Sequence, residues 1–267
     1  MSFGGSTYWN CNAFIKSFDY VSTNSCLNLY SRAHGTGFST SRIESIIVSI
    51  TEAMERLCFY ECFSQPELRK KYSFDIDSTT NGLAAHPAAL KTAIVNSRAE
   101  AEERYLLQLF NLKKLLFVGK REKNSVKYYI LKANLESPYY LVIAYFFDSE
   151  FSSFGFSSSD SVDTAMEKSK KELIRNYISL VAYNEKKVEI ESIFEERLVK
   201  FSGSSGRKIF NDLLSGQKLD ELPARKDTVV DLPVIESEEK YGFKFYRTLY
   251  QPVNDLYDIG NSNMFFF

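Results

Sequence analysis

The sequence predicts a mixed α+β fold (α/β mixed) in a single domain that spans residues 1–267. Three observations lead to this prediction. Stretches with apolar residues three and four positions apart, typical of amphipathic helices, interleave with short runs of β-branched and aromatic residues, typical of strands. The composition is that of a globular chain, with 44% hydrophobic and 25% charged residues. Neither a G-x-G-x-x-G nor a G-x-x-x-x-G-K-[ST] motif occurs, so no doubly wound dinucleotide-binding pattern is expected.

The first half of the chain predicts strands followed by two long helices. Residues 1–40, which include the alternating stretch Cys26–Tyr30, are typical of short strands and loops. A helix is expected from Ser41, an N-cap candidate, to about Cys62. Its apolar residues form one stripe: Ile43, Ile46, Ile47, Ile50, Met54 and Leu57. The alternation of residues 72–76 predicts a strand, and Pro87 is typical of the first turn of a helix that runs to about Asn111.

The second half predicts a sheet, a third long helix and a last strand. Strands are expected at residues 115–118, 126–131 and 139–147, and the Ser, Phe and Gly residues of 152–160 predict a loop. A helix follows over residues 162–182. Residues 183–235 are typical of short helices with a break at Gly203–Gly206, and residues 241–250 alternate as in a strand.

Composition excludes several classes of protein. The 33 basic and 34 acidic residues give a net charge of −1, which argues against a protein that mainly neutralises nucleic acid. The longest apolar run, residues 139–147, is far too short to span a membrane, and no signal peptide is recognised, so a cytoplasmic protein is expected. The four cysteines do not form a disulfide framework or a zinc pattern. The 22 Phe and 17 Tyr residues predict an aromatic core and a partner interface, and the terminal Phe run could dock into a partner subunit or fray.

The most informative pattern is a repeated glutamate pair followed by arginine. It occurs as Glu52-Ala-Met-Glu55-Arg56 and as Glu100-Ala-Glu-Glu103-Arg104, and each copy lies downstream of a glycine-containing turn. Glu172-Leu-Ile-Arg175 is a weaker echo. Carboxylates three positions apart lie on the same side of a helix. Two such helices that meet would offer Mg²⁺ the hard oxygen ligands that it prefers. The arginines that follow could neutralise phosphates. A set of solvated Glu–Arg pairs is the structural alternative, and the spacing alone does not decide between the two.

These residues carry a resemblance to the YcaO superfamily. The stretch from Gly35 to Arg56 looks like its first signature. Ser78-Thr-Thr-Asn81-Gly-Leu-Ala-Ala85, followed by residues 100–104, resembles the second. Residues 157–175 are similar to the third, and residues 243–255 resemble the strand and proline-containing turn that follow it. The chain looks like a short, divergent member that ends in Asn263-Met-Phe-Phe-Phe267 and lacks the Pro-rich tail of azoline-forming members.

The resemblance implies a fold, two cofactors and a set of site residues. The fold is YcaO-like, with mixed sheets and with helices that carry paired glutamates around a central nucleotide cleft. The cofactors are ATP and Mg²⁺. The implied residues are, for the metal, Glu52, Glu55, Glu100, Glu103 and Glu172; for the nucleotide, Asn81, Ala85, Ser39, Arg104 and Lys168; and for catalysis, Glu103, Arg104 and Arg56.

The implied activity is ATP-dependent phosphorylation of a backbone amide in a ribosomally made precursor peptide. The product is an azoline, a thioamide or an amidine, according to the nucleophile that attacks the activated carbonyl. The resemblance also implies a separate leader-recognition or accessory protein, and a homodimer is compatible with it. The alternative is a non-catalytic YcaO-like subunit that binds a partner protein or the precursor peptide without using ATP.

Overall fold

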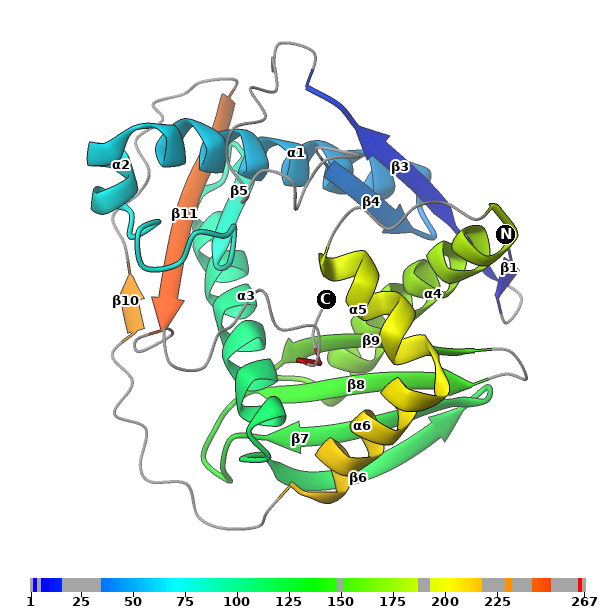
Figure 1. Ribbon diagram of the computed structural model, residues 1–267. Coiled ribbons are helices and arrows are strands. Elements are labelled where there is room, and N and C mark those ends of the chain that lie inside the picture. Colours follow the sequence, from blue (N-terminus) through cyan, green and yellow to red (C-terminus); the bar gives the residue numbers. More distant parts are fainter. Residues whose placement is uncertain are drawn as a thin grey trace. The chain divides into compact units, whose positions relative to one another are not determined.

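A computed structural model of the protein describes residues 2–3, 6–15, 35–147, 151–186, 193–217, 229–231, 242–250 and 264–265. Helices and antiparallel sheets alternate along the chain, which confirms the predicted α+β class (Figure 1). The chain divides into two compact units. Unit 1 comprises Met1–Ala101 and Asp227–Tyr257, and unit 2 comprises Glu102–Lys226 and Asp258–Phe267. The prediction of a single domain over residues 1–267 stays a prediction.

Unit 1 contains small sheets with long helices beside them. Strands β1 (Ser2–Phe3) and β2 (Ser6–Thr7) form one pair, and β3 (Trp9–Ala13) and β4 (Gly35–Ser39) form another. A three-stranded sheet has the order β10–β11–β5, with β10 (Val229–Asp231), β11 (Phe243–Tyr250) and β5 (Leu83–Pro87). The helices are α1 (Arg42–Ser64), α2 (Pro66–Lys71) and the first half of α3 (Leu90–Asn111). Helix α1 confirms the helix expected to begin near Ser41, and α3 confirms the helix expected to end at about Asn111. Strand β11 confirms the expected last strand.

Helix α1 packs against β4 through small residues, while its apolar stripe is largely exposed. A Cβ atom added at Gly35 or Gly37 would collide with backbone atoms of α1 at Ser45, Ser49 and Ala53, so helix and strand approach at backbone distance. Ile43, Ile46, Ile47 and Ile50 are all exposed, Ile43 to 71%, whereas Leu57 is buried. The periodicity therefore located the helix correctly, but the small-residue face is the one that packs on the strand.

The segment between α2 and β5 is a turn, which corrects the strand expected at residues 72–76. Arg247, fully buried on β11, determines its path. The guanidinium donates to the carbonyl oxygens of Tyr72 at 2.7 Å and Asp77 at 2.8 Å, with longer bonds to Thr79 and Asn81. It also lies 3.7 Å from the Phe74 ring centroid. Because these carbonyls converge on one side chain, the segment cannot extend into a ladder. Pro87 likewise ends β5 and does not begin α3.

Unit 2 is built on a four-stranded antiparallel sheet with the order β6–β7–β8–β9. Its strands are β6 (Leu116–Lys123), β7 (Val126–Lys132), β8 (Tyr140–Phe147) and β9 (Ser152–Ser159). The three strands expected before residue 150 are confirmed. The fourth replaces the loop expected at residues 152–160, because Ser153 and Gly155 are buried against α4 (Val162–Lys186), where a side chain at Gly155 would not fit.

Helices cover both faces of this sheet. Gly155 faces α4, and its neighbour Phe154 points to the opposite face, where Phe210 of α6 lies at 4.7 Å between ring centroids. Helix α5 (Ile193–Ser202) precedes α6 (Ser204–Ser215), which begins at the expected Gly203 break (Figure 1). The helix predicted over residues 162–182 is therefore confirmed as α4.

The aromatic residues form the core of unit 2. Rings of Phe110, Phe154, Phe201 and Phe210 surround Phe265, which is fully buried. The Asn111 side chain accepts the N–H of Phe265 at 2.6 Å and donates to its carbonyl oxygen at 3.0 Å. Phe265 thus docks within its own unit, which corrects both the partner-docking and the fraying expectation for this residue. Phe266, Phe267, Cys26–Tyr30 and residues 251–255 lie outside the described residues.

Two further expectations concern cysteines and membranes. Cys58 and Cys62 are buried free thiols in the unit 1 core, and Cys11 is a partly buried one. Within the described ranges, no helix has the length and apolar character needed to cross a bilayer.

Candidate functional site

Four of the predicted glutamates accept hydrogen bonds from backbone amides along the edges of sheets. Strands β4, β5 and β9 each have a neighbour on one side only in the described sheets, so one row of their N–H groups has no strand partner. Glutamates from the long helices accept hydrogen bonds from these groups. The pairs are Thr36 N–H to Glu52 at 2.7 Å, Ala85 N–H to Glu55 at 2.8 Å, Phe156 N–H to Glu172 at 2.8 Å and Ser158 N–H to Glu103 at 3.0 Å.

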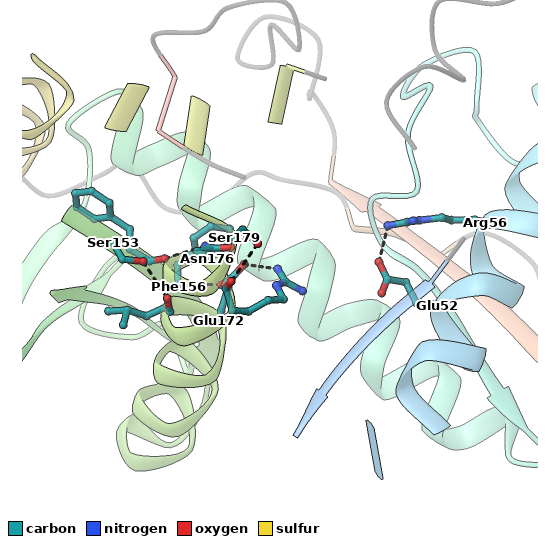
Figure 2. Close-up of polar contacts among 10 residues, drawn as sticks. Glu52, Arg56, Ser153, Phe156, Glu172, Asn176 and Ser179 are labelled. Carbon is teal, nitrogen blue, oxygen red and sulfur yellow. Dashed lines mark hydrogen bonds and ion pairs between the residues drawn. The ribbon is translucent and has the colours of Figure 1, made fainter. Parts of the chain in front are cut away.

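In unit 1, Glu52, Glu55 and Glu100 form what we call the unit 1 cluster. Glu52 is half-buried and pairs with Arg56, one helical turn away, at 2.6 Å (Figure 2). The pKa of Glu55 is raised well above its ordinary value, first by burial and then by the negative charge of Glu100, with a smaller effect of Glu52. The Ala85 N–H opposes this rise. Three carboxylates thus act on one another here, with Arg56 paired to Glu52 and Arg247 acting electrostatically on Glu100.

In unit 2, Glu103 and Glu172 form the unit 2 cluster. They bind N–H groups two residues apart on the same strand, β9, so their carboxylates lie side by side along its edge. Burial raises the pKa of Glu172 to about 7, Glu103 adds to the rise, and Arg175 and Arg104 oppose it. Figure 2 shows Glu172 beside Phe156, with Ser153 and Asn176 nearby on the same strand and helix. The guanidinium of Arg104 lies 5.7 Å from the Phe156 ring centroid.

The donor atoms of these clusters, although not the assembled geometry, are of the type that Mg²⁺ prefers. All the candidate ligands are carboxylate oxygens, and the amide bonds fix one oxygen of each of the four anchored carboxylates. Oε2 of Glu55 and Oε1 of Glu103 have no hydrogen-bond partner among the described residues, and like charges raise the pKa of Glu55 in a way that a cation would relieve. No group of three or more His, Cys, Asp or Glu side chains in the described ranges is assembled closely enough to hold a metal.

The predicted nucleotide residues have different surroundings. Ala85 is buried on β5 and anchors Glu55, and Asn81 lies in the turn before β5, where its side chain donates to Asp77 at 3.2 Å. Ser39 is buried, and its hydroxyl binds Glu44 at the start of α1. Lys168 is exposed on α4. The structure therefore places Ala85 at the unit 1 cluster, Asn81 in the turn beside Asp77, and Ser39 next to Glu44 at the start of α1, whose N-cap is Ser41.

Sequence reasoning missed the strand amides and the partner of Glu172. The amides of Phe156 and Ser158 lie in the segment that composition assigned to a loop, so their row of N–H groups was invisible to it. Arg175 ends the weak third echo, and the sequence suggests no role for it, although its guanidinium nitrogen lies 3.4 Å from a carboxylate oxygen of Glu172. The sequence signal for Arg175 is the Glu172-Leu-Ile-Arg175 segment itself: it repeats the first glutamate of the pair and has arginine where the second glutamate would be.

Comparisons with known proteins give matches among solved structures. No family model and no curated protein matches the sequence. The E. coli microcin synthetase McbBCD complex contains a chain that is 14% identical, with a TM-score of 0.51 over 81% of each chain. The same complex with pro-MccB17 bound gives 14% identity and a TM-score of 0.50 over 78% of this chain and 79% of that one. YcaO from Methanopyrus kandleri, bound with AMPPCP and Mg²⁺, gives 16% identity, a TM-score of 0.47, and coverage of 80% and 77%.

Proposed function

We propose that this chain, which is similar in fold to a chain of the E. coli microcin synthetase complex, is a YcaO-type, ATP- and Mg²⁺-dependent enzyme subunit that activates a backbone amide of a precursor peptide. The observation that carries the proposal is the anchoring of Glu52, Glu55, Glu103 and Glu172 by backbone amides along the edges of three edge strands. Such anchoring fixes carboxylates before any ligand binds, which is the preorganisation that charge stabilisation requires.

The proposed reaction has two steps. The amide oxygen attacks the γ-phosphorus of ATP, the bond from that phosphorus to the bridging oxygen breaks, and ADP leaves. A nucleophile then adds to the amide carbon, and the former amide oxygen departs with its phosphate. Phosphorylation is needed because an unmodified oxide is a very poor leaving group, whereas phosphate is a good one.

The glutamates and the arginines of the site have different proposed roles. Glu52, Glu55, Glu100, Glu103 and Glu172 would hold the metal, and Arg56 and Arg104 would neutralise phosphate oxygens. Bound Mg²⁺ supplies Lewis-acid stabilisation of phosphate charge. Ala85 and Asn81 would border the nucleotide, with Ser39 and Lys168 as the further predicted contacts.

The protein that brings the substrate is also part of the proposal. One of the two similar complexes holds a bound pro-peptide. We propose a ribosomally made precursor peptide as substrate, delivered by a separate leader-recognition or accessory protein. Co-expression with the peptide and intact-mass measurement would identify the product. Loss of one water indicates an azoline, exchange of oxygen for sulfur indicates a thioamide, and exchange of oxygen for an imino nitrogen indicates an amidine.

Thermal unfolding with Mg-ATP tests the proposal directly, because a ligand that binds only the folded chain raises its melting temperature. The wild type should be stabilised at millimolar Mg-ATP, whereas Glu55→Gln and Glu103→Gln should lose most of this stabilisation. Glu67→Gln and Glu167→Gln, at exposed positions on α2 and α4, are matched controls and should respond like the wild type. Equal stabilisation of all five proteins would overturn the assigned ligands.

A scaffold function without ATP is the second candidate, and one observation favours it. Arg56 and Arg175 already pair with Glu52 and Glu172, so each cluster carries an internal counter-charge. A chain of this kind needs no cation to hold its glutamates. It would bind partner or peptide unchanged in the presence of Mg-ATP, and its melting temperature would not respond to the nucleotide with or without the partner.

A further inference from the structure

Strand β6 forms the edge of the unit 2 sheet opposite β9, and the described residues leave this edge uncovered. It pairs with β7 on one side, and no strand of the described ranges lies on the other (Figure 1). At the β9 edge, by contrast, glutamates of α4 and α3 accept the N–H groups of Phe156 and Ser158. No described residue outside the β6–β7 hairpin hydrogen-bonds to the backbone of residues 116–123. One edge is thus satisfied by carboxylates of the chain itself, and the other is not.

The turn between β6 and β7 determines which backbone groups point outward. Its two central residues, 124–125, have φ values of 52° and 63°, as in a type I′ turn. In such a hairpin the residues on either side of the turn, Lys123 and Val126, exchange both hydrogen bonds. Hydrogen-bonded and non-hydrogen-bonded pairs then alternate along the ladder. The N–H and C=O groups of Lys120 and Glu122 therefore point away from β7 and have no partner in the described chain.

The side chains along this edge are strongly basic. Residues 113–132 contain seven basic residues and one acidic residue, Glu122, in a chain whose net charge is −1. Two of the seven are in ion pairs within the unit. Lys114, Lys120 and Lys123 are exposed and have no ion pair among the described residues. An excess of positive charge therefore lies beside the outward backbone groups.

The start of β6 adds two exposed apolar side chains. Phe117 is 42% exposed and Val118 is 48% exposed. The pairing with β7 shifts between Phe117 and Gly119, which marks a bulge, so regular pairing along the outer edge is confined to the residues that follow it. An added strand would meet apolar side chains at one end of β6 and lysines toward the turn.

We propose that β6 is a docking edge for a partner protein, an extended acidic segment of which adds to the sheet as a fifth strand and pairs with the outward groups of Lys120 and Glu122. In this mode of recognition the backbone bonds favour any extended chain, and the side chains select among sequences. Here the exposed lysines select carboxylates. The inference goes beyond the proposed function and does not depend on it.

Two other occupants match this edge less well. A second copy of β6 would join two segments that each carry three basic residues and one acidic residue over 120–123, and lysines on edge strands oppose such self-association. A nucleic acid would meet the lysines with its phosphates, but it has no row of N–H and C=O groups to match those of Lys120 and Glu122. An extended acidic polypeptide uses both features.

Fluorescence anisotropy with a labelled synthetic peptide tests the docking edge. The probe has the length of β6 and alternates Glu with Val, so it is acidic and suited to an extended backbone. We expect it to bind the wild-type chain, and to bind more weakly as the salt concentration rises. A peptide of the same sequence with methylated backbone nitrogens keeps the charges but loses the N–H donors, and it should bind about tenfold or more weakly.

Variants of β6 separate the effect of charge from that of the backbone. Lys120→Glu should weaken peptide binding about fivefold or more, whereas Lys70→Glu, at an exposed position on α2, is the matched control and should bind like the wild type. Glu122→Pro removes an outward N–H and leaves the N–H groups that face β7, so it should weaken binding about threefold or more. Glu122→Gln removes the same charge but keeps the N–H, and it should bind at least as tightly as the wild type. Lys120→Glu alters only an exposed side chain, so the test does not depend on the folding of the proline variant.

Several results would overturn the inference. It is wrong if the acidic peptide does not bind, if the methylated peptide binds equally well, or if Lys120→Glu binds like the wild type. It is also wrong if oligothymidylate binds more tightly than the peptide, because the edge would then recognise phosphates. Sedimentation of the chain alone tests the remaining occupant, since a dimer that Glu122→Pro dissociates would mean that β6 pairs with a second copy. None of these measurements involves Mg-ATP, so their failure would leave the proposed function intact.

Discussion

At the scale of single residues, Glu172 shows how the candidate site affects stability. Its carboxyl has a pKa of about 7 in the folded chain, raised mainly by burial, whereas an unfolded chain gives it a pKa near the ordinary 4.5. The folded state therefore keeps a proton that the unfolded state releases between these two values. The contribution of Glu172 to the free energy of unfolding is therefore largest below about pH 4.5 and is lost as the pH rises through 7. Glu172 stabilises the folded chain only while its carboxyl group is protonated.

Glu172→Gln should remove this pH dependence. The amide oxygen of Gln can still accept the Phe156 N–H, but it never ionises, so the variant should be more stable than the wild type by up to about 3 kcal/mol above pH 7. Urea unfolding at pH 5 and pH 8 without divalent cations measures the difference between the two proteins at each pH. The difference should grow from pH 5 to pH 8, and Glu167→Gln should show no such growth. A constant difference would contradict the assignment.

Arg247 is the second residue with a predicted effect. Its buried guanidinium is bound by four carbonyl oxygens, so replacement leaves several acceptors without a donor. Arg247→Met should cost about 3 kcal/mol or more, and Arg247→Lys should cost less because it keeps the charge and part of the bonding. Arg121→Met, at an exposed ion pair, should change the free energy of unfolding by less than about 1 kcal/mol. A stable Arg247→Met would show that the turn holds its shape without this residue.

At the scale of elements, the contact between strand and helix explains which features the sequence could reveal. The long helices were predictable, because caps and apolar spacing are local signals. The apolar spacing also recurs over several turns of the 23-residue helix α1. Strand β9 was not predictable, because its serines and glycine are typical of a loop. They form a strand only because α4 packs against them, and that contact is tertiary.

The candidate site likewise has a part that could be predicted, the glutamates, and a part that could not, the backbone N–H groups that anchor them. The shared helix face of each glutamate pair was predictable from the spacing, since residues three apart lie on one side of a helix, whereas a role as metal ligands was implied only by the family resemblance. The anchoring groups were not predictable, because a backbone N–H has no sequence signature and the row at β9 belongs to a strand that composition assigned to a loop. The buried face of α1 was also misjudged, since close approach to Gly35 and Gly37 favours Ser45, Ser49 and Ala53 over larger apolar residues.

Two glycines allow a matched test of this packing. Gly155→Ala places a Cβ against the Ser169 carbonyl oxygen of α4, so strand and helix must separate. Gly119→Ala, in β6 of the same sheet, adds a Cβ that meets nothing within 4 Å. We expect Gly155→Ala to lose about 2 kcal/mol or more of stability, or not to fold, and Gly119→Ala to differ little from the wild type. Comparable melting temperatures for the two variants would disprove the close packing of β9 on α4.

At the scale of the whole molecule, each unit is closed by a distant segment of the chain. Strand β11 completes the unit 1 sheet, and Phe265 fills the aromatic core of unit 2. Phe265→Ala should therefore cost about 3–5 kcal/mol, because it empties a cavity among four rings. Phe117→Ala, at a 42% exposed position on β6, should cost far less. Calorimetry of both variants tests the claim, and it fails if the two lose similar stability.

The order of these segments bears on how the chain folds during synthesis. Translation delivers residues 1–101 first, but their sheet lacks β11 until residue 250 has been made, and unit 2 lacks Phe265 for longer still. Neither unit can complete its core until nearly all of these residues have been made, unlike domains that form from uninterrupted stretches. Most of the polypeptide must emerge with its aromatic surfaces uncovered. Chaperone capture of nascent chains is thus expected to matter more for this protein than its modest length suggests.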